Sequence, residues 1–225
     1  MFNARTKIVA KAPGNLDILS AWGLPHTLVT NCLQRPLAAL ITSGSLAELY
    51  LKFLQDFHTT GLWPVCTDDP EHPWLQHHPL DFPFAPSQPP FPATLRARPA
   101  ESPPEILLCP GLAPPEALLL VPVRRPADVP AALNWSGSVR RNFNGNDISG
   151  CLRSWEDRYG AVITNIGADK LDVLVTHPPT TSEQSREIAE EIHAICPDIV
   201  SQGSTTTELL QALVEDSDTW YFWWD

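Results

Sequence analysis

Proline is distributed unevenly along this chain, and that distribution limits where regular structure can form. Eighteen of the 24 prolines lie between Pro64 and Pro130. Because proline fixes φ and lacks a backbone donor, neither a helix nor an interior strand continues easily through such a stretch. We therefore expect residues 66–115 to be a Pro-rich linker or an ordered loop, between a small N-terminal region (1–65) and a C-terminal module (116–225).

The N-terminal region has the pattern of a small α/β unit. Residues 6–10 and 36–42 are apolar runs typical of strands, and a shorter run lies between them. Ser45 and Glu48 form a capping box, which predicts the start of a helix. Apolar side chains then recur at helical spacing until Gly61, where we expect the helix to end.

Four strands are predicted in the C-terminal module. Residues 117–121 are continuously apolar, as expected of a central strand that is covered on both faces. Residues 170–176 instead alternate between apolar and polar side chains, which predicts one buried face. Two further strands are expected over residues 161–166 and 219–225.

Three helices are predicted between these strands. Asn146 or Asp147 caps the first, which ends at Gly160. A capping box beginning at Thr180 starts the second, and another beginning at Thr205 starts a short third. The resulting order, β-α-β-β-α-(α)-β, predicts an α+β fold with a ferredoxin-like split βαβ sheet and one added short helix. In that topology the first and third strands are central, which suits the continuously apolar run.

The formal charge of −11 is concentrated near the C-terminal end. Residues 181–225 contain ten acidic residues and one basic residue. A surface this negative repels phosphate backbones and anionic lipids, so we expect no nucleic-acid and no membrane partner. Five scattered cysteines, the lack of a long apolar run and the lack of an apolar N-terminal signal favour a cytoplasmic protein with free thiols.

Several short motifs resemble one known family. In order, they resemble the bacterial domain-of-unknown-function family 4253 (DUF 4253) over about 117–225. The resemblance implies a small cytoplasmic bacterial domain, and some families of this style are immunity partners of secreted toxins. The motifs are Trp-Ser-Gly at 135–137, Arg-Ser-Trp-Glu-Asp-Arg-Tyr-Gly-Ala at 153–161, His-Pro-Pro at 177–179, Cys-Pro-Asp at 196–198, Gln-Gly-Ser at 202–204 and Phe-Trp-Trp-Asp at 222–225, with a weaker echo, Gly-Leu-Trp-Pro-Val, at 61–65.

The residues predict no catalytic group, no metal and no cofactor. His193 and Cys196 lie three apart and histidines cluster within 72–78, but the paired cysteines of a structural zinc site are missing. Glycine-rich phosphate loops and a nucleophile elbow are missing as well. A cysteine–histidine pair would have to be assembled in space, from Cys151 or Cys196 with His177.

Two groups of residues are candidates for binding. Around Trp155, either this ring is a core residue beside a solvated salt-bridge face, or Arg153, Glu156 and Arg158 contact a ligand or partner near the turn at Trp135. The second group, Glu187, Glu190 and Glu191, is expected on the exposed side of the following helix.

The last strand leaves a further alternative open. Trp223 and Tyr221 share the face opposite Trp220, Phe222 and Trp224. They form either a second core face or an exposed interface, since tyrosine and tryptophan are favoured anchors of binding sites.

The leading hypothesis is a non-enzymatic binding or immunity-type protein whose acidic module engages a basic, toxin-like protein partner. The alternative is a small hydrolase or transferase with a cleft near Trp135, Arg153 and His177. A third hypothesis is a structural or regulatory module that uses the Pro-rich segment as a docking surface. The oligomeric state stays open.

Overall fold

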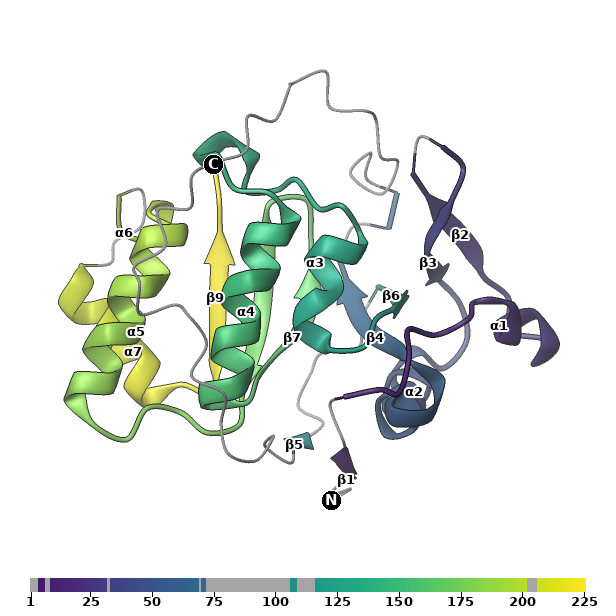
Figure 1. Cartoon of the computed structure of the whole chain (residues 1–225), viewed down its shortest axis with the longest axis horizontal. Helices are drawn as coiled ribbons and strands as arrows, with labels where there is room; N and C mark the ends of the chain where they lie inside the picture. The colour runs from purple at the N-terminus through teal and green to yellow at the C-terminus, as the bar shows by residue number, and fades with distance from the viewer. Residues whose placement is uncertain are drawn as a thin grey trace.

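The structure is a computed structural model of the 225-residue chain (Figure 1). It describes residues 4–6, 9–31, 33–68, 70–71, 106–108, 116–201 and 206–225. Several positions that the sequence singles out lie outside these ranges: most of the Pro-rich segment, the histidines within 72–78, Cys32, Cys109, Thr205 and the motif at 202–204.

The described elements, in chain order, are β1 (Ala4–Thr6), α1 (Asp17–Ala21), β2 (Thr27–Thr30), β3 (Pro36–Ile41), α2 (Leu46–Thr60), β4 (Leu62–Thr67), β5 (Ile106–Leu108), β6 (Ala117–Pro122), the 3-10 turn η3 (Pro126–Asp128), α3 (Val129–Ala132), the 3-10 turn η4 (Val139–Arg141), α4 (Gly145–Tyr159), β7 (Ala161–Ile166), β8 (Lys170–Val175), α5 (Ser182–Ile195), α6 (Asp198–Ser201), α7 (Thr207–Asp216) and β9 (Thr219–Trp223). The α+β class predicted from the sequence is confirmed. None of the described helices is both long and apolar enough to cross a membrane.

One mixed sheet organises the molecule. Its order over the described residues is β2-β3-β6-β4-β7-β8-β9, and β1 pairs separately with β5. Strand β6 is antiparallel to β3 on one side and to β4 on the other, with Leu120 opposite Ala39 and Pro64. Leu118, Leu119 and Leu120 are all buried. The prediction that this apolar run is a central strand is confirmed.

Strand β4 changes the predicted topology. A ferredoxin-like sheet would place the predicted first and third strands, β6 and β8, side by side. Here β4 lies next to β6, and β7 separates β4 from β8. Strand β4 pairs with β7 in parallel at Cys66 and Asn165. The sheet therefore combines strands from residues 1–67 with strands from residues 117–225, and its order is not ferredoxin-like.

Proline hides β4 in the sequence. All six residues of β4 are buried, yet Pro64 stands in the middle of the strand and argues against a ladder there. The strand tolerates it because the recorded pairing with β7 consists of a single residue pair. The buried Trp63 provides a substitute contact, since its Nε1 donates to the Ile163 carbonyl at 2.9 Å.

Helix ends agree with the sequence to within a residue or two. Helix α2 follows Ser45, but the predicted capping box is wrong, because the Ser45 side chain makes no capping hydrogen bond. The helix ends at Gly61, whose φ of 64° suits a residue without Cβ. Helix α4 begins earlier than predicted, because Asn144 is its cap and forms a capping box with Asp147. It ends as expected at Gly160.

Helices α5 and α7 each begin one residue later than predicted. Thr181, and not Thr180, caps α5 by accepting a hydrogen bond from the Gln184 backbone N–H. Thr206 caps α7 in the same way, accepting from the backbone N–H of Leu209.

In Figure 1, helix α4 passes in front of the C-terminal strands, and β9 is seen between α4 and α5. Trp155 of α4 is buried, as one interpretation of the sequence predicts, and its ring stacks on Phe222 at 5.4 Å between centroids. Trp220 meets the same ring edge-on at 5.8 Å. Leu171 and Val173 of β8 are buried, which confirms the predicted alternation of that strand.

Candidate functional site

Helix α5 carries most of the acidic face that the sequence predicts. Glu183, Glu187 and Glu190 are exposed on it. Glu190 also forms an ion pair with Arg186 one turn earlier on the same helix. Glu191 does not belong to this face.

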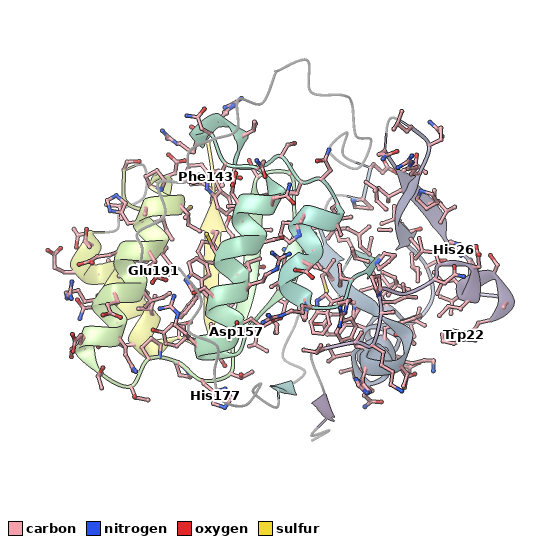
Figure 2. All side chains as sticks on the ribbon, viewed as in Figure 1. Trp22, His26, Phe143, Asp157, His177 and Glu191 are labelled. Carbon is pink, nitrogen blue, oxygen red and sulfur yellow. The ribbon has the colours of Figure 1, made fainter. Side chains whose placement is uncertain are left out.

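Glu191 is buried between α4 and α5, and the prediction that it is exposed was wrong (Figure 2). The indole Nε1 of Trp155 donates to its Oε2 at 2.7 Å, and Arg158 forms an ion pair with the same oxygen. The spacing explains the error: Glu191 follows the buried Ile188 by three residues, so the helix turns it towards the same side. Glu191 and Arg158 thus join two helices and are not free to bind a partner.

Glu156 is also buried, although the sequence predicts an outward orientation. It follows the buried Leu152 by four residues and therefore lies on the stripe of α4 that η3 and α3 cover. The Arg125 Nε donates to Glu156 Oε2 at 2.5 Å, and the same guanidinium forms an ion pair with Asp157. The backbone N–H of Ala127 donates to the other Glu156 oxygen at 3.4 Å. The two adjacent carboxylates, Glu156 and Asp157, thus meet at one guanidinium.

This environment changes the acidity of Glu156. Burial raises the pKa of its carboxyl from 4.5 to about 7, although the neighbouring Arg125 works in the opposite direction. Since the group is fully enclosed, it cannot contact a ligand without rearrangement of η3. We interpret it as a structural bridge between α4 and the segment before it.

The other predicted residues near Trp135 do not share one surface. Trp135 is buried, its Nε1 donates to the Gly167 carbonyl at 2.8 Å, and its ring packs edge-on against Trp224 at 5.3 Å. Arg153 is exposed and bonds Asp128 at 2.5 Å. The first residue belongs to the core and the second to a surface ion pair.

The cysteine–histidine arrangement weighed from the sequence is not brought together. His177 is exposed at the lower edge of the molecule, 2.9 Å from the Thr176 hydroxyl (Figure 2). Cys151 and Cys196 are buried, and the Cys196 thiol donates to the Trp223 carbonyl at 2.9 Å. Burial raises the pKa of Cys196 to about 12 and also raises that of Cys151, so both thiols stay protonated at neutral pH.

Metal ligands do not converge in the described ranges either. Among these residues, no three His, Cys, Asp or Glu side chains are placed to hold one ion. His193 is half-buried at the end of α5, while Cys196 is fully buried.

The final strand has one buried and one open face. Trp220, Phe222 and Trp224 are buried. Tyr221 is 51% exposed and Trp223 is half-buried, so the face that these two share is not a second closed core. Of the two alternatives for this strand, the exposed face is the one present.

Helix α7 exposes an apolar pair that sequence reasoning missed. Leu210 and Val214 face inward, where α7 packs along α5. Leu209 and Leu213 are 46% and 47% exposed. The sequence does contain a signal for this pair. Leu209 and Leu213 are four residues apart and lie beside the buried pair, so α7 is apolar on two sides. Glu208 and Glu215 are exposed on the same helix.

The comparisons with known proteins add a family and nothing further. No curated protein and no solved structure matches the chain. Residues 117–225 match the model of a family described as Domain of unknown function (DUF4253). The matched segment begins at β6 and includes α4, α5, α7 and β9, and therefore the helices that carry the exposed glutamates and the exposed leucines. The C-terminal segment of this chain, residues 117–225, belongs to the DUF4253 family.

Proposed function

We propose that this protein is a non-enzymatic binding module of the immunity type, and that its α5–α7 surface engages a basic protein partner. The observation that carries the proposal is the exposed pair Leu209 and Leu213 on α7, with the carboxylates of Glu208 and Glu215 on the same helix. An apolar centre with a polar rim is the usual composition of a protein-binding surface.

The two leucines supply the affinity in this proposal. Fully burying one leucine side chain contributes about 2 kcal/mol. Each of these side chains is nearly half exposed, so a partner that covers both gains roughly 2 kcal/mol in total from them. Surface leucines are common singly, but a pair one turn apart on one helix forms a continuous apolar strip.

In this proposal, the negative charge of the α5–α7 surface makes association with the partner selective and fast. Two acidic residues of the 181–225 region are neutralised inside the protein, Glu191 by Arg158 and Asp198 by Arg141. Exposed carboxylates nevertheless extend over α5 and α7, including Glu183 and Glu187. Such a field attracts a basic partner and accelerates encounter, and the effect weakens as salt is added.

We also propose that the protein acts in the cytoplasm. Cys66, Cys151 and Cys196 are free, buried thiols. Free thiols are typical of a reducing compartment, in which an immunity-type protein would meet a toxin that has entered the cell.

The proposal is tested with purified protein and one matched control. A partner captured from lysate at low salt is purified, and its Kd is measured for wild type, for Leu209→Ala/Leu213→Ala and for Leu28→Ala. Leu28 is a suitable control because it is 45% exposed on β2, outside the α5–α7 surface. We expect a basic partner whose Kd rises about tenfold for the double variant, equivalent to about 1.4 kcal/mol, and rises again with salt.

Two results would refute the binding proposal. One is the recovery of no partner at either low or high salt. The other is a partner that binds wild type and the double variant equally tightly, because the α7 leucines would then lie outside its interface.

A further inference from the structure

The C-terminal strands have a second face that points away from α4. Asp172 of β8 lies between the buried Leu171 and Val173, so its side chain points to the opposite side of the sheet. The strand register places Tyr221 opposite Asp172 and Trp223 opposite Lys170. Directly opposed residues share a face, so these four side chains stand together on it.

Hydrogen bonds order the polar groups on this face. The Asn165 Nδ2 donates to Asp172 Oδ2 at 3.2 Å, and the Lys170 ammonium forms an ion pair with Asp68 at the end of β4. Among the described residues, the salt bridges include none to Asp172. Asp172 is therefore a half-buried carboxylate whose hydrogen-bond partner is a neutral amide.

Leaving a partly buried carboxylate without a cation is costly. Burial raises the pKa of Asp172, and the nearby Asp68 acts in the same direction, while Asn165 and Lys170 act against it. Asp172 has an aromatic neighbour that is open to solvent, because Tyr221 is 51% exposed. The face thus offers an anion beside an accessible ring.

The site continues inward to groups from the N-terminal region. Cys66 of β4 pairs with Asn165 in the register of β4 and β7, so the thiol is on the same face. Behind it, the Tyr50 hydroxyl of α2 is buried and has no hydrogen-bond partner among the residues that the structure describes. Burial is the main cause that raises the pKa of Cys66 to about 12, and Asp172 adds to it. Groups from both ends of the chain therefore meet here.

We propose that this sheet face is a binding site for a small organic cation, an amine or a guanidine, that pairs with Asp172 and lies over the ring of Tyr221 beside Trp223. This site is on the opposite side of the sheet from α4 and is independent of the α5–α7 surface.

The chemistry of the face selects a cation. Asp68, Asp169 and Asp172 against the single ammonium of Lys170 leave two net negative charges around Tyr221, and all four groups influence the pKa of its hydroxyl. A cation near an aromatic face is attracted by the ring quadrupole. A flat guanidinium can also donate two parallel N–H bonds to a carboxylate, and its positive charge makes these bonds stronger than those of a neutral ligand.

The test uses the full chain and four simple probes. Methylguanidinium and n-butylammonium chloride are titrated into ¹⁵N-labelled protein, with methylurea and n-butanol as neutral counterparts. The indole N–H signal of Trp223, assigned from a Trp223→Phe variant, reports on the site. We expect the cations to shift this signal saturably and the neutral compounds to leave it in place.

Three variants separate binding from folding. Asp172→Asn is expected to weaken cation affinity at least tenfold while Tm stays unchanged or rises, because the half-buried charge is removed. Tyr221→Leu is expected to weaken it about threefold, the cost of one exposed cation–π contact of about 0.7 kcal/mol. Glu187→Gln, an exposed carboxylate of α5, is the matched control and should leave the affinity unchanged.

The proposal is overturned by any of three outcomes. The cations fail to shift the Trp223 signal, they bind Asp172→Asn as tightly as wild type, or the neutral compounds shift the signal equally. A clear fall in Tm for Asp172→Asn would also count against it, because that result assigns the carboxylate a structural role.

Discussion

Replacing Glu156 with glutamine is expected to remove a pH dependence of stability that this carboxylate creates. Burial raises the pKa of Glu156 from 4.5 to about 7 in the folded protein. Between these values the folded state holds a proton that the unfolded state has released. The free energy of unfolding of wild type should therefore fall as pH rises through this window and level off above it.

The structure sets an upper bound on the size of this effect. The two pKa values differ by about 2.5, and about 1.4 kcal/mol for each pKa unit gives a loss of about 3 kcal/mol between pH 5 and pH 8. Glutamine has the shape of a protonated glutamate, and its single carbonyl oxygen can still accept from Arg125, whereas the long 3.4 Å contact with the Ala127 N–H is lost because the other end of the amide is a donor. Arg125 also keeps its ion pair with Asp157.

Urea unfolding, followed by tryptophan fluorescence from pH 5 to pH 8, measures this difference. The curves of wild type and Glu156→Gln should coincide near pH 5 and separate by up to about 3 kcal/mol near pH 8, with the variant the more stable. Glu187→Gln controls for loss of an exposed carboxylate and should follow wild type. A constant difference between wild type and Glu156→Gln at every pH would refute the assignment of this pH dependence to Glu156.

Two further predictions concern the helices of the family domain. Glu191→Ala leaves Arg158 and the Trp155 N–H without their carboxylate, and should lower the free energy of urea unfolding by about 3 kcal/mol. Glu190→Ala, on the exposed side of α5, should cost well under about 1 kcal/mol; equal losses would contradict the inward orientation of Glu191. Asn144→Ala removes the capping box of α4 and should cost about 1 kcal/mol in the same assay, while an unchanged midpoint would argue against the cap.

Local patterns predict most elements of this fold because each carries its own signal. The end of α4 at Gly160 and the alternation of β8 depend on neighbours within one element, and both appear as predicted. Strand order depends on contacts between distant segments. No pattern in β6 or β7 indicates that β4 lies between them, and Pro64 masks the strand itself.

The candidate surfaces show the same limit at the level of single residues. Glu187 and Glu190 are exposed as predicted, whereas Glu156 and Glu191 are buried. Charge alone predicts that all four glutamates face solvent, whereas helical spacing alone predicts that Glu156 and Glu191 face inward. Spacing prevails here because Arg125 and Arg158 each supply a cation at the buried position. Those pairings come from tertiary contacts that a single sequence does not reveal.

The position of β4 shows that the sheet extends beyond the segment that the family model matches. Strands β6 and β7 belong to the matched segment 117–225, yet β4, which lies between them, comes from residues 62–67. A fragment that starts at Ala117 would retain every family motif of that segment but would lack β4, the strand between β6 and β7. Both edges of β6 and the facing edge of β7 would then stand open, because β3 and β4 are absent, and each open edge is a template for pairing with another chain. Boundaries drawn by sequence similarity would thus yield an aggregation-prone piece, and expression of this family's domain should start upstream of Gly61.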